Sequence, residues 1–209
     1  MKFTTPVFFT FVTALGIISA VSSCTKSDRF AGTWQGNQER IANIPDAADA
    51  SYTLTIDFAP EKPGAKNGVA DFNAVVNISQ AVQSTNPDAL VSPFEANVTA
   101  TASITATYFM ENGEDDDILL SFDPSSLQVN VDPAGVTLTQ DALSNTERPM
   151  LDSLTAATAN HWRVLITSAM RNEFNRFTKI EDIKVHHGDM MSCEVDHRDL
   201  TFRRVGVPD

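Results

Sequence analysis

Cysteine and the large polar aromatics are scarce in this chain of 209 residues, which holds two cysteines, two tyrosines and two tryptophans. Cys24 lies near one end of the chain and Cys193 near the other. At most one disulfide could form between them, so small folds held together by several disulfides are excluded. A chain of this length can instead bury a hydrophobic core of its own.

Basic residues are also few. The chain has 15 Lys and Arg against 27 Asp and Glu, a formal net charge of −12, and the basic residues form no cluster. Nucleic-acid binding relies on neutralising phosphates with Lys and Arg, so we expect no nucleic-acid partner. Adsorption of this acidic chain to anionic lipid by charge alone is equally disfavoured.

Motifs of enzymes are missing. The sequence has no Gly-x-Ser-x-Gly, no glycine-rich phosphate loop and no His-Glu-x-x-His. We therefore expect a protein that is not an enzyme and that carries no cofactor. A hydrolase built on paired carboxylates remains the least favoured hypothesis.

The N-terminus has the layout of a secretion signal. Lys2 supplies a positive charge, an uncharged apolar stretch follows over residues 6–20, and small residues lead to Cys24. The stretch is too short for a spanning helix, which needs about 20 apolar residues. An ordinary secretory signal that leaves Cys24 free is the alternative to the interpretation that follows.

This arrangement resembles the lipobox of bacterial lipoproteins, which are cut just before a cysteine that receives acyl chains such as palmitate. The resemblance implies a signal peptide over residues 1–23, a tether over 24–29 and a single domain over 30–209. It places the protein in the bacterial cell envelope, anchored through Cys24, and leaves Cys193 without an intramolecular partner. Thr25 replaces the Asp that retains some lipoproteins at the inner membrane, so the outer membrane is favoured. Which membrane face carries the protein stays open.

Alternating apolar and polar residues predict β-strands over much of the domain. The pattern covers residues 52–58, 72–78 and 98–110, with shorter strands expected at 118–122, 127–131 and 136–138. Residues 80–93 contain two prolines and predict a long loop. A strand of thirteen residues is long and indicates a coiled sheet or a barrel wall.

A helical period replaces the alternation from Thr146 to about Phe177. Apolar residues at one face of a 3.6-residue repeat predict one long helix that bends or ends near Arg171. Three strands are expected after it. The length of each connection decides which face of the next strand points inward. The apolar faces of all three strands point inward if the connections are a three-residue loop at 188–190 and a four-residue turn at 196–199.

The domain begins with Gly32-Thr33-Trp34, and its last strand ends with Arg203 and Arg204. This pair of features resembles the lipocalins and lipocalin-like bacterial lipoproteins. The resemblance implies that Trp34 closes one barrel end and that Arg203 or Arg204 packs over it. The expected fold is mainly β with one long helix: an antiparallel, lipocalin-like barrel or half-barrel, with the helix inserted before the last three strands.

Two groups of residues carry side chains that can bind a metal. His186, His187, Cys193 and His197 lie within twelve residues, but the strand register places them on opposite faces and at opposite ends of a hairpin. The acidic run over 111–117 lacks the spacing of an EF-hand, and calcium there stays a minor alternative. No metal is therefore expected, and Cys193 is expected to be buried.

Two functions remain. The first is a lipid-anchored binding protein that holds an apolar small molecule in its barrel. The alternative is a structural scaffold or a subunit that binds an envelope protein, with a filled core and no ligand. An open cavity or a packed interior distinguishes them.

Overall fold

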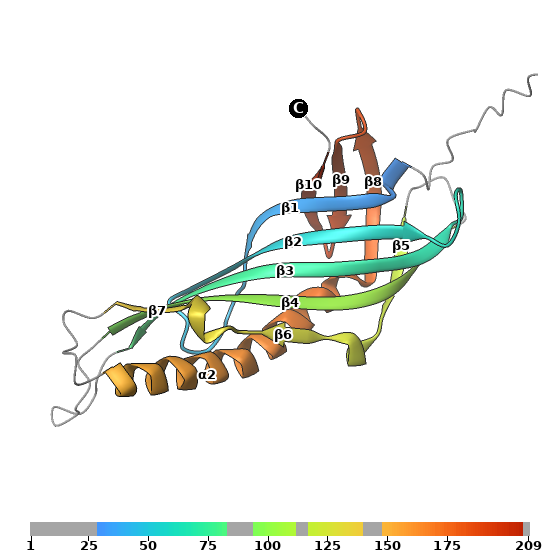
Figure 1. Cartoon of the computed structure of the whole chain (residues 1–209). Helices are drawn as coiled ribbons and strands as arrows, with labels where there is room; N and C mark the ends of the chain where they lie inside the picture. Colours follow the sequence, from blue (N-terminus) through green and yellow to red (C-terminus); the bar gives the residue numbers. More distant parts are fainter. Residues whose placement is uncertain (1–28, 83–93, 112–116, 140–147, 207–209) are drawn as a thin grey trace, which may run out of the picture.

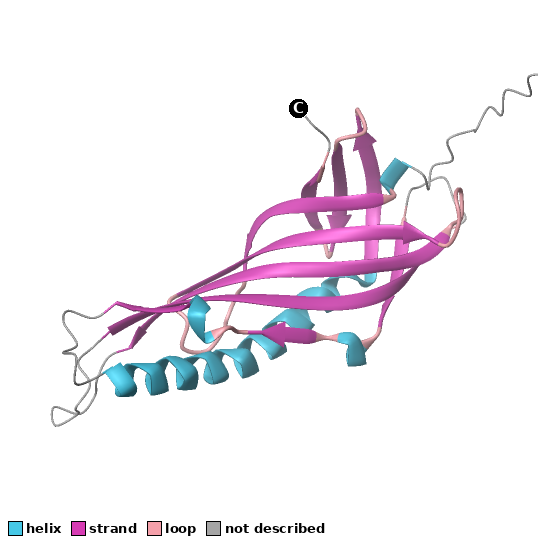
Figure 2. Ribbon diagram, in the orientation of Figure 1, coloured by secondary structure: helices cyan, strands magenta, loops and turns pink. Residues whose placement is uncertain are grey.

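A computed structural model describes residues 29–82, 94–111, 117–139 and 148–206, which form ten strands and one long helix (Figures 1 and 2). The first strands are β1 (Gly32–Arg40), β2 (Asp49–Pro60), β3 (Asn67–Val82), β4 (Phe94–Met110) and β5 (Ile118–Phe122). Then come β6 (Gln128–Asn130), β7 (Val136–Thr139), the helix α2 (Arg148–Asn175), and β8 (Lys179–His186), β9 (Met190–Val195) and β10 (Arg198–Arg204). The fold predicted from the sequence, mainly β with one long helix before the last three strands, is confirmed.

Eight strands close into an antiparallel barrel. Their order is β1, β2, β3, β4, β5, β8, β9 and β10, and β10 pairs back with β1, where Trp34 lies opposite Arg204. The remaining two strands, β6 and β7, pair with β4 beyond the point where β5 leaves it. The barrel therefore opens at one end into a longer sheet.

That longer sheet consists mainly of β2, β3 and β4. The pairing of β3 with β4 runs without a break from Asn67 opposite Phe109 to Val82 opposite Phe94. Side chains alternate strictly across it, because successive residues of a strand point to opposite faces. Apolar side chains such as Phe72, Val76 and Ile104 are buried on the inner face, and the outer face is mostly Thr, Asn and Asp.

Helix α2 runs along the inner face of this sheet, below β4 and β6 in Figure 1. Trp162 is fully buried there and donates a hydrogen bond from Nε1 to Oε1 of Gln80 at 3.0 Å. The helix ends at Asn175, four residues beyond Arg171, and a short 3₁₀ turn with a non-helical backbone at Phe177 follows it. Its buried residues recur four positions apart from Trp162 to Phe174, so the apolar stripe winds gradually around the helix as it enters the barrel.

The loop between β8 and β9 has three residues, as predicted, but it is displaced by one position. Val185 pairs with Met191 and His186 with Met190, which leaves residues 187–189 in the loop instead of 188–190. His187 has a φ of 50° and leaves the strand face on which the sequence placed it. A bulge with Asp182 at φ 51° still lets Ile183 point inward.

The predicted four-residue turn between β9 and β10 is wrong. Val195 pairs with Arg198, so only Asp196 and His197 form the turn, with φ values of 50° and 60°. Two successive positive φ angles match the two-residue turn that follows the natural twist of a hairpin. The inner face is preserved, because Leu200 still points inward, but Arg198 now points inward as well.

Several expectations lie outside the described residues. These are the signal at 1–23, Cys24 and the tether up to residue 28, most of the loop at 80–93, the helix start at 146–147 and residues 112–116 of the acidic run. In the part of the chain that the structure does describe, no helix is both long and apolar enough to cross a membrane.

Candidate functional site

The interior of the barrel is filled by aromatic side chains from the sheet and the helix. The ring of Phe72 on β3 lies 5.0 Å from Phe122, 6.1 Å from Phe174 and 5.6 Å from Phe177, measured between ring centroids. All three pairs are edge-to-face, the geometry that aromatic pairs prefer. The end of α2 thus occupies the place where an open barrel would hold a ligand.

A small apolar pocket remains beside this cluster, where β1 separates from β10. It is lined mainly by Tyr52, Leu54, Phe177, Leu200 and Phe202, and its volume is about 10 Å³. That is room for about one water molecule. The pocket is far smaller than the sites that bind apolar cofactors or lipids, which measure roughly 300–1,000 Å³.

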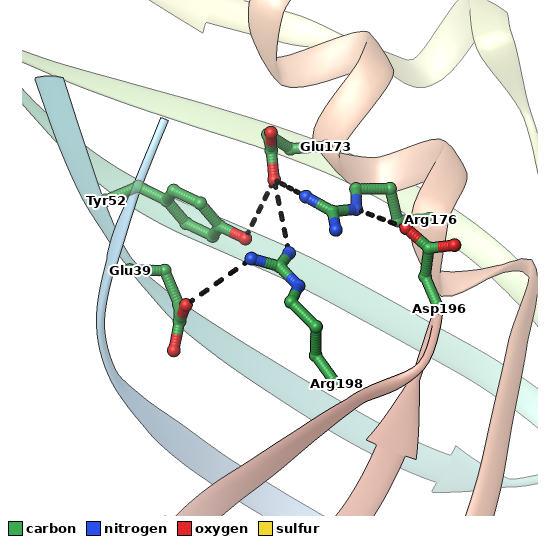
Figure 3. A network of polar contacts seen from close by, with 6 residues as sticks. All are labelled: Glu39, Tyr52, Glu173, Arg176, Asp196 and Arg198. Carbon is green, nitrogen blue, oxygen red and sulfur yellow. Dashed lines mark hydrogen bonds and ion pairs between the residues drawn. The ribbon is translucent and has the colours of Figure 1, made fainter. Parts of the chain in front are cut away.

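Beside the pocket, a network of polar side chains surrounds Glu173, which is buried near the end of α2 (Figure 3). Its Oε2 accepts a hydrogen bond from the hydroxyl of Tyr52 at 3.2 Å and pairs with Arg176 at 3.4 Å. The same oxygen lies 4.0 Å from Arg198, whose other terminal nitrogen lies 3.8 Å from Glu39. Glu39 belongs to β1 and Tyr52 to β2, so the network joins the helix to three strands.

Arg176 extends the network to the β9–β10 turn, where its Nε donates a hydrogen bond to Asp196 at 2.8 Å. Burial, and then the neighbouring Glu173 carboxylate, raise the pKa of the Tyr52 hydroxyl well above its ordinary value. Such a tyrosine keeps its proton and donates a hydrogen bond to Glu173. The arrangement ties elements together. On its inner side it faces a space of about one water molecule. On its outer side, Arg176 and Asp196 help to line an open depression of about 330 Å³.

The sequence missed this network for two reasons. The predicted four-residue turn at 196–199, which lets Val195 and Leu200 face inward together, puts Arg198 in the turn. Glu173 lies four positions after Ala169 and seven after Ile166, so it falls on the apolar stripe of the helix. A charged residue on that stripe was the available signal, because a buried carboxylate requires a partner.

Trp34 and Arg204, two of the residues predicted to close the barrel, lie at its opposite end. The guanidinium carbon of Arg204 lies 4.4 Å from the centre of the Trp34 ring, and the indole Nε1 donates a hydrogen bond to the carbonyl oxygen of Phe30 at 2.7 Å. Arg203 points to the exposed outer face instead. Gly32 has a φ of 107°, and a Cβ there would lie 3.0 Å from Nη1 of Arg204, so a glycine suits this position.

Arg204 also holds the chain where it enters the barrel. Its nitrogens donate hydrogen bonds to the carbonyl oxygens of Gly188 at 2.8 Å, Ala31 at 2.8 Å and Arg29 at 2.6 Å. A single side chain therefore connects the first described residues, the β8–β9 loop and Trp34.

Replacing Arg204 with Met is expected to lower the free energy of unfolding by about 2 kcal/mol, because it removes the cation–π contact and three charge-assisted hydrogen bonds. Arg203→Met is the matched control and should change it by less than about 0.5 kcal/mol, since Arg203 is exposed. Urea unfolding of both variants measures the difference. Equal effects would show that the contacts of Arg204 contribute nothing beyond its charge.

The histidines and Cys193 do not meet. His186 contacts Ser192 at 3.2 Å. His197, in the β9–β10 turn, lies 3.5 Å from Glu194 on β9, and Cys193 is buried. Burial raises the pKa of the Cys193 thiol to about 12, so it stays protonated and unreactive at neutral pH. Among the described residues, no three His, Cys, Asp or Glu side chains are grouped so as to hold a metal ion.

At the end of the acidic run, Asp117 already has partners. Its carboxylate lies 3.0 Å from Nζ of Lys179 and accepts a hydrogen bond from the backbone of Asp182 at 3.2 Å. Lys179 also contacts Glu181 at 2.6 Å. These contacts attach the start of β5 to β8.

No family model, curated protein or solved structure matches this chain. Every statement about its function therefore depends on its own sequence and geometry. The two sites just described are the network around Glu173 and the contact between Trp34 and Arg204. Both connect distant segments of the chain, and the interior pocket beside the Glu173 network is too small for a substrate.

Proposed function

We propose that the protein is a bacterial lipoprotein, anchored in the cell envelope through acyl chains on Cys24, whose lipocalin-like domain is a rigid structural or partner-binding module. The observation that carries this proposal is the filled interior, in which Phe72, Phe174 and Phe177 pack against one another. Because the described interior has space for only about one water molecule, we expect the protein to act through its surface. Enzymatic activity forms no part of the proposal.

The signal-like segment and Cys24 support the anchor, and the absence of Asp at position 25 supports the outer membrane. The polar outer face of the long sheet supports a role in presenting a surface. Its side chains bond to one another across strands, as Thr105 does to Asp71 at 2.7 Å and Thr99 to Asn77 at 3.1 Å. Such mutual bonds hold an ordered, hydrated face that suits a polar envelope protein as partner.

The anchor is tested in a Gram-negative host by Cys24→Ser, in which residues 1–23 are also replaced by a secretory signal that is cleaved without a cysteine. We expect the wild type in the membrane pellet, with acyl chains on the N-terminal peptide, because two or more chains hold a protein stably in a bilayer. The variant should be recovered almost entirely in the soluble fraction. Equal recovery of both proteins in the membrane pellet would contradict the acyl anchor.

The filled interior is tested on the same soluble Cys24→Ser protein. Native mass spectrometry should give the mass of the polypeptide alone, and N-phenyl-1-naphthylamine, an apolar fluorescent probe, should gain no emission. A bound apolar molecule in a one-to-one ratio would support the first hypothesis, a ligand-binding barrel, and would overturn this one.

A further inference from the structure

Large apolar side chains gather on the outside of the barrel at the end where the chain enters. The described residues expose seven large apolar side chains. Five of them belong to this end of the barrel: Val69, Phe109, Leu119, Met190 and Val205. The other two are Val75, in the middle of β3, and Val164, on the helix.

The strand register places this group, which we term the rim. Phe109 lies opposite Asn67 at the start of β3 and opposite Leu119 on β5, and Val69 is two positions further along β3. On the other side of the barrel, Met190 begins β9, and the backbone of Val205 donates a hydrogen bond to Thr33 at the start of β1. In Figure 1, the start of β1, the β2–β3 turn and the β8–β9 turn all lie toward the upper right, far from the start of α2.

The entering chain packs directly inside the rim. The ring of Phe30 lies 6.4 Å from the ring of Tyr108, the inward-facing neighbour of Phe109 on β4. Arg204 holds the backbone of Arg29 at the same end. The sequence places Cys24 only five residues before Arg29. Fully extended, five residues span at most about 18 Å.

We propose that the rim docks on the lipid bilayer and seats its apolar side chains in the headgroup region, so that the barrel stands on its Trp34 end with α2 and the long sheet directed away from the membrane. This inference depends on the proposed acyl anchor at Cys24. A tether of this length holds the rim against the membrane surface. Transfer of apolar side chains from water to the interface then lowers the free energy.

The charges near the rim are mixed. The exposed basic residues Arg29, Lys62, Lys66 and Arg203 lie at this end together with the exposed acidic residues Glu61, Asp71, Glu111 and Asp189. Attraction of the basic residues to anionic lipid is opposed by the acidic ones, so apolar contact must dominate. Zwitterionic phosphatidylcholine vesicles are therefore the appropriate probe.

The test uses the full lipidated protein with a tryptophan reporter in the rim, Phe109→Trp, inserted into phosphatidylcholine vesicles whose acyl chains carry bromine. Bromine quenches only indoles that approach the chains. The natural Trp34 and Trp162 are fully buried and give the background. After the wild-type emission is subtracted, we expect the emission of the Phe109→Trp reporter to fall about two-fold relative to the same vesicles without bromine, the result for a side chain seated at the interface.

Val75→Trp is the matched control. Val75 is exposed to 46% and Phe109 to 48%, both on the outer face of the sheet. Val75 pairs with Thr101, eight positions from Phe109 along β4, which separates the two by about 26 Å. The control reporter should therefore stay unquenched, like the wild type.

The outcomes separate the inference from the anchor on which it depends. Mass analysis first establishes whether Cys24 is acylated. With acyl chains present, an unquenched Phe109→Trp, or equal quenching of both reporters, overturns the docking of the rim and leaves the anchor intact. An unmodified Cys24 overturns the anchor, and the docking with it.

Discussion

Raising the pH from 8 to 11 is expected to lower the free energy of unfolding by about 4–6 kcal/mol, enough to unfold a domain of ordinary stability. Three buried groups cause the loss: the thiol of Cys193 and the hydroxyls of Tyr52 and Tyr108. Burial raises the pKa of Cys193 and of Tyr108 to about 12 in the folded protein. The pKa of Tyr52 is raised further, by burial and by Glu173.

The direction of the effect follows from proton binding. In the unfolded chain the thiol loses its proton above about pH 9 and the tyrosines above about pH 10, whereas the folded protein keeps all three protons. Above these values the unfolded state binds fewer protons, so stability falls as the pH rises. Each group contributes about 1.4 kcal/mol per pH unit until its folded pKa is reached.

Urea unfolding at pH 8, 9, 10 and 11 measures this loss, and tyrosinate absorbance measures its origin. Both tyrosines of the chain are among the three groups, so folded protein should show almost no tyrosinate at pH 10.5. Cys193→Ala should move the onset of the loss from about pH 9 to about pH 10. Tyrosinate that forms near pH 10 in protein that is still folded would contradict the prediction.

Replacing Phe174 with Ala is expected to lower the free energy of unfolding by about 3–5 kcal/mol. The Phe174 side chain is almost completely buried. The centroid of its ring lies 6.1 Å from that of Phe72 and 6.4 Å from that of Phe122. Its removal would leave a cavity between the helix and the sheet, which neither can close without disturbing the Glu173 network one residue away. Thermal and urea unfolding measure the loss.

Val164→Ala is the control on the same helix. Val164 is exposed to 66%, so its truncation should change stability by less than about 0.5 kcal/mol. A mild effect of Phe174→Ala, similar to the control, would mean that the helix end can leave the barrel at little cost. The interior would then be available to a ligand, and the proposed function would have to change.

The strands and the helix were predictable because their patterns are local. The alternation of apolar and polar residues over 98–110 predicted a strand with one buried and one solvated face, and β4 has both faces. The pairing of β1 with β2, β2 with β3 and β3 with β4 follows because strands that are neighbours in the chain commonly pair. The packing of Trp34 against the last strand was predicted from two short motifs, Gly32-Thr33-Trp34 and Arg203-Arg204, together with their resemblance to those of lipocalins.

The polar network was not predictable, because it depends on which of two allowed turns is used. A two-residue and a four-residue turn both keep Leu200 inside, and only the two-residue turn also brings Arg198 inside. The choice is decided by Glu39 and Glu173, which lie 159 and 25 positions before Arg198 and supply the opposite charges. Pairing over such separations leaves no local pattern in one sequence.

The pairing of β1 with β10 also has a consequence for the order of folding. Trp34 and Arg204 face each other although 204 − 34 = 170 positions separate them in the chain. Closing so large a loop is entropically costly, so the β3–β4 hairpin forms readily while the seam at Trp34 must wait for the last strand. The barrel therefore closes last, and the hairpins made by neighbouring strands must hold together without it until β10 is in place.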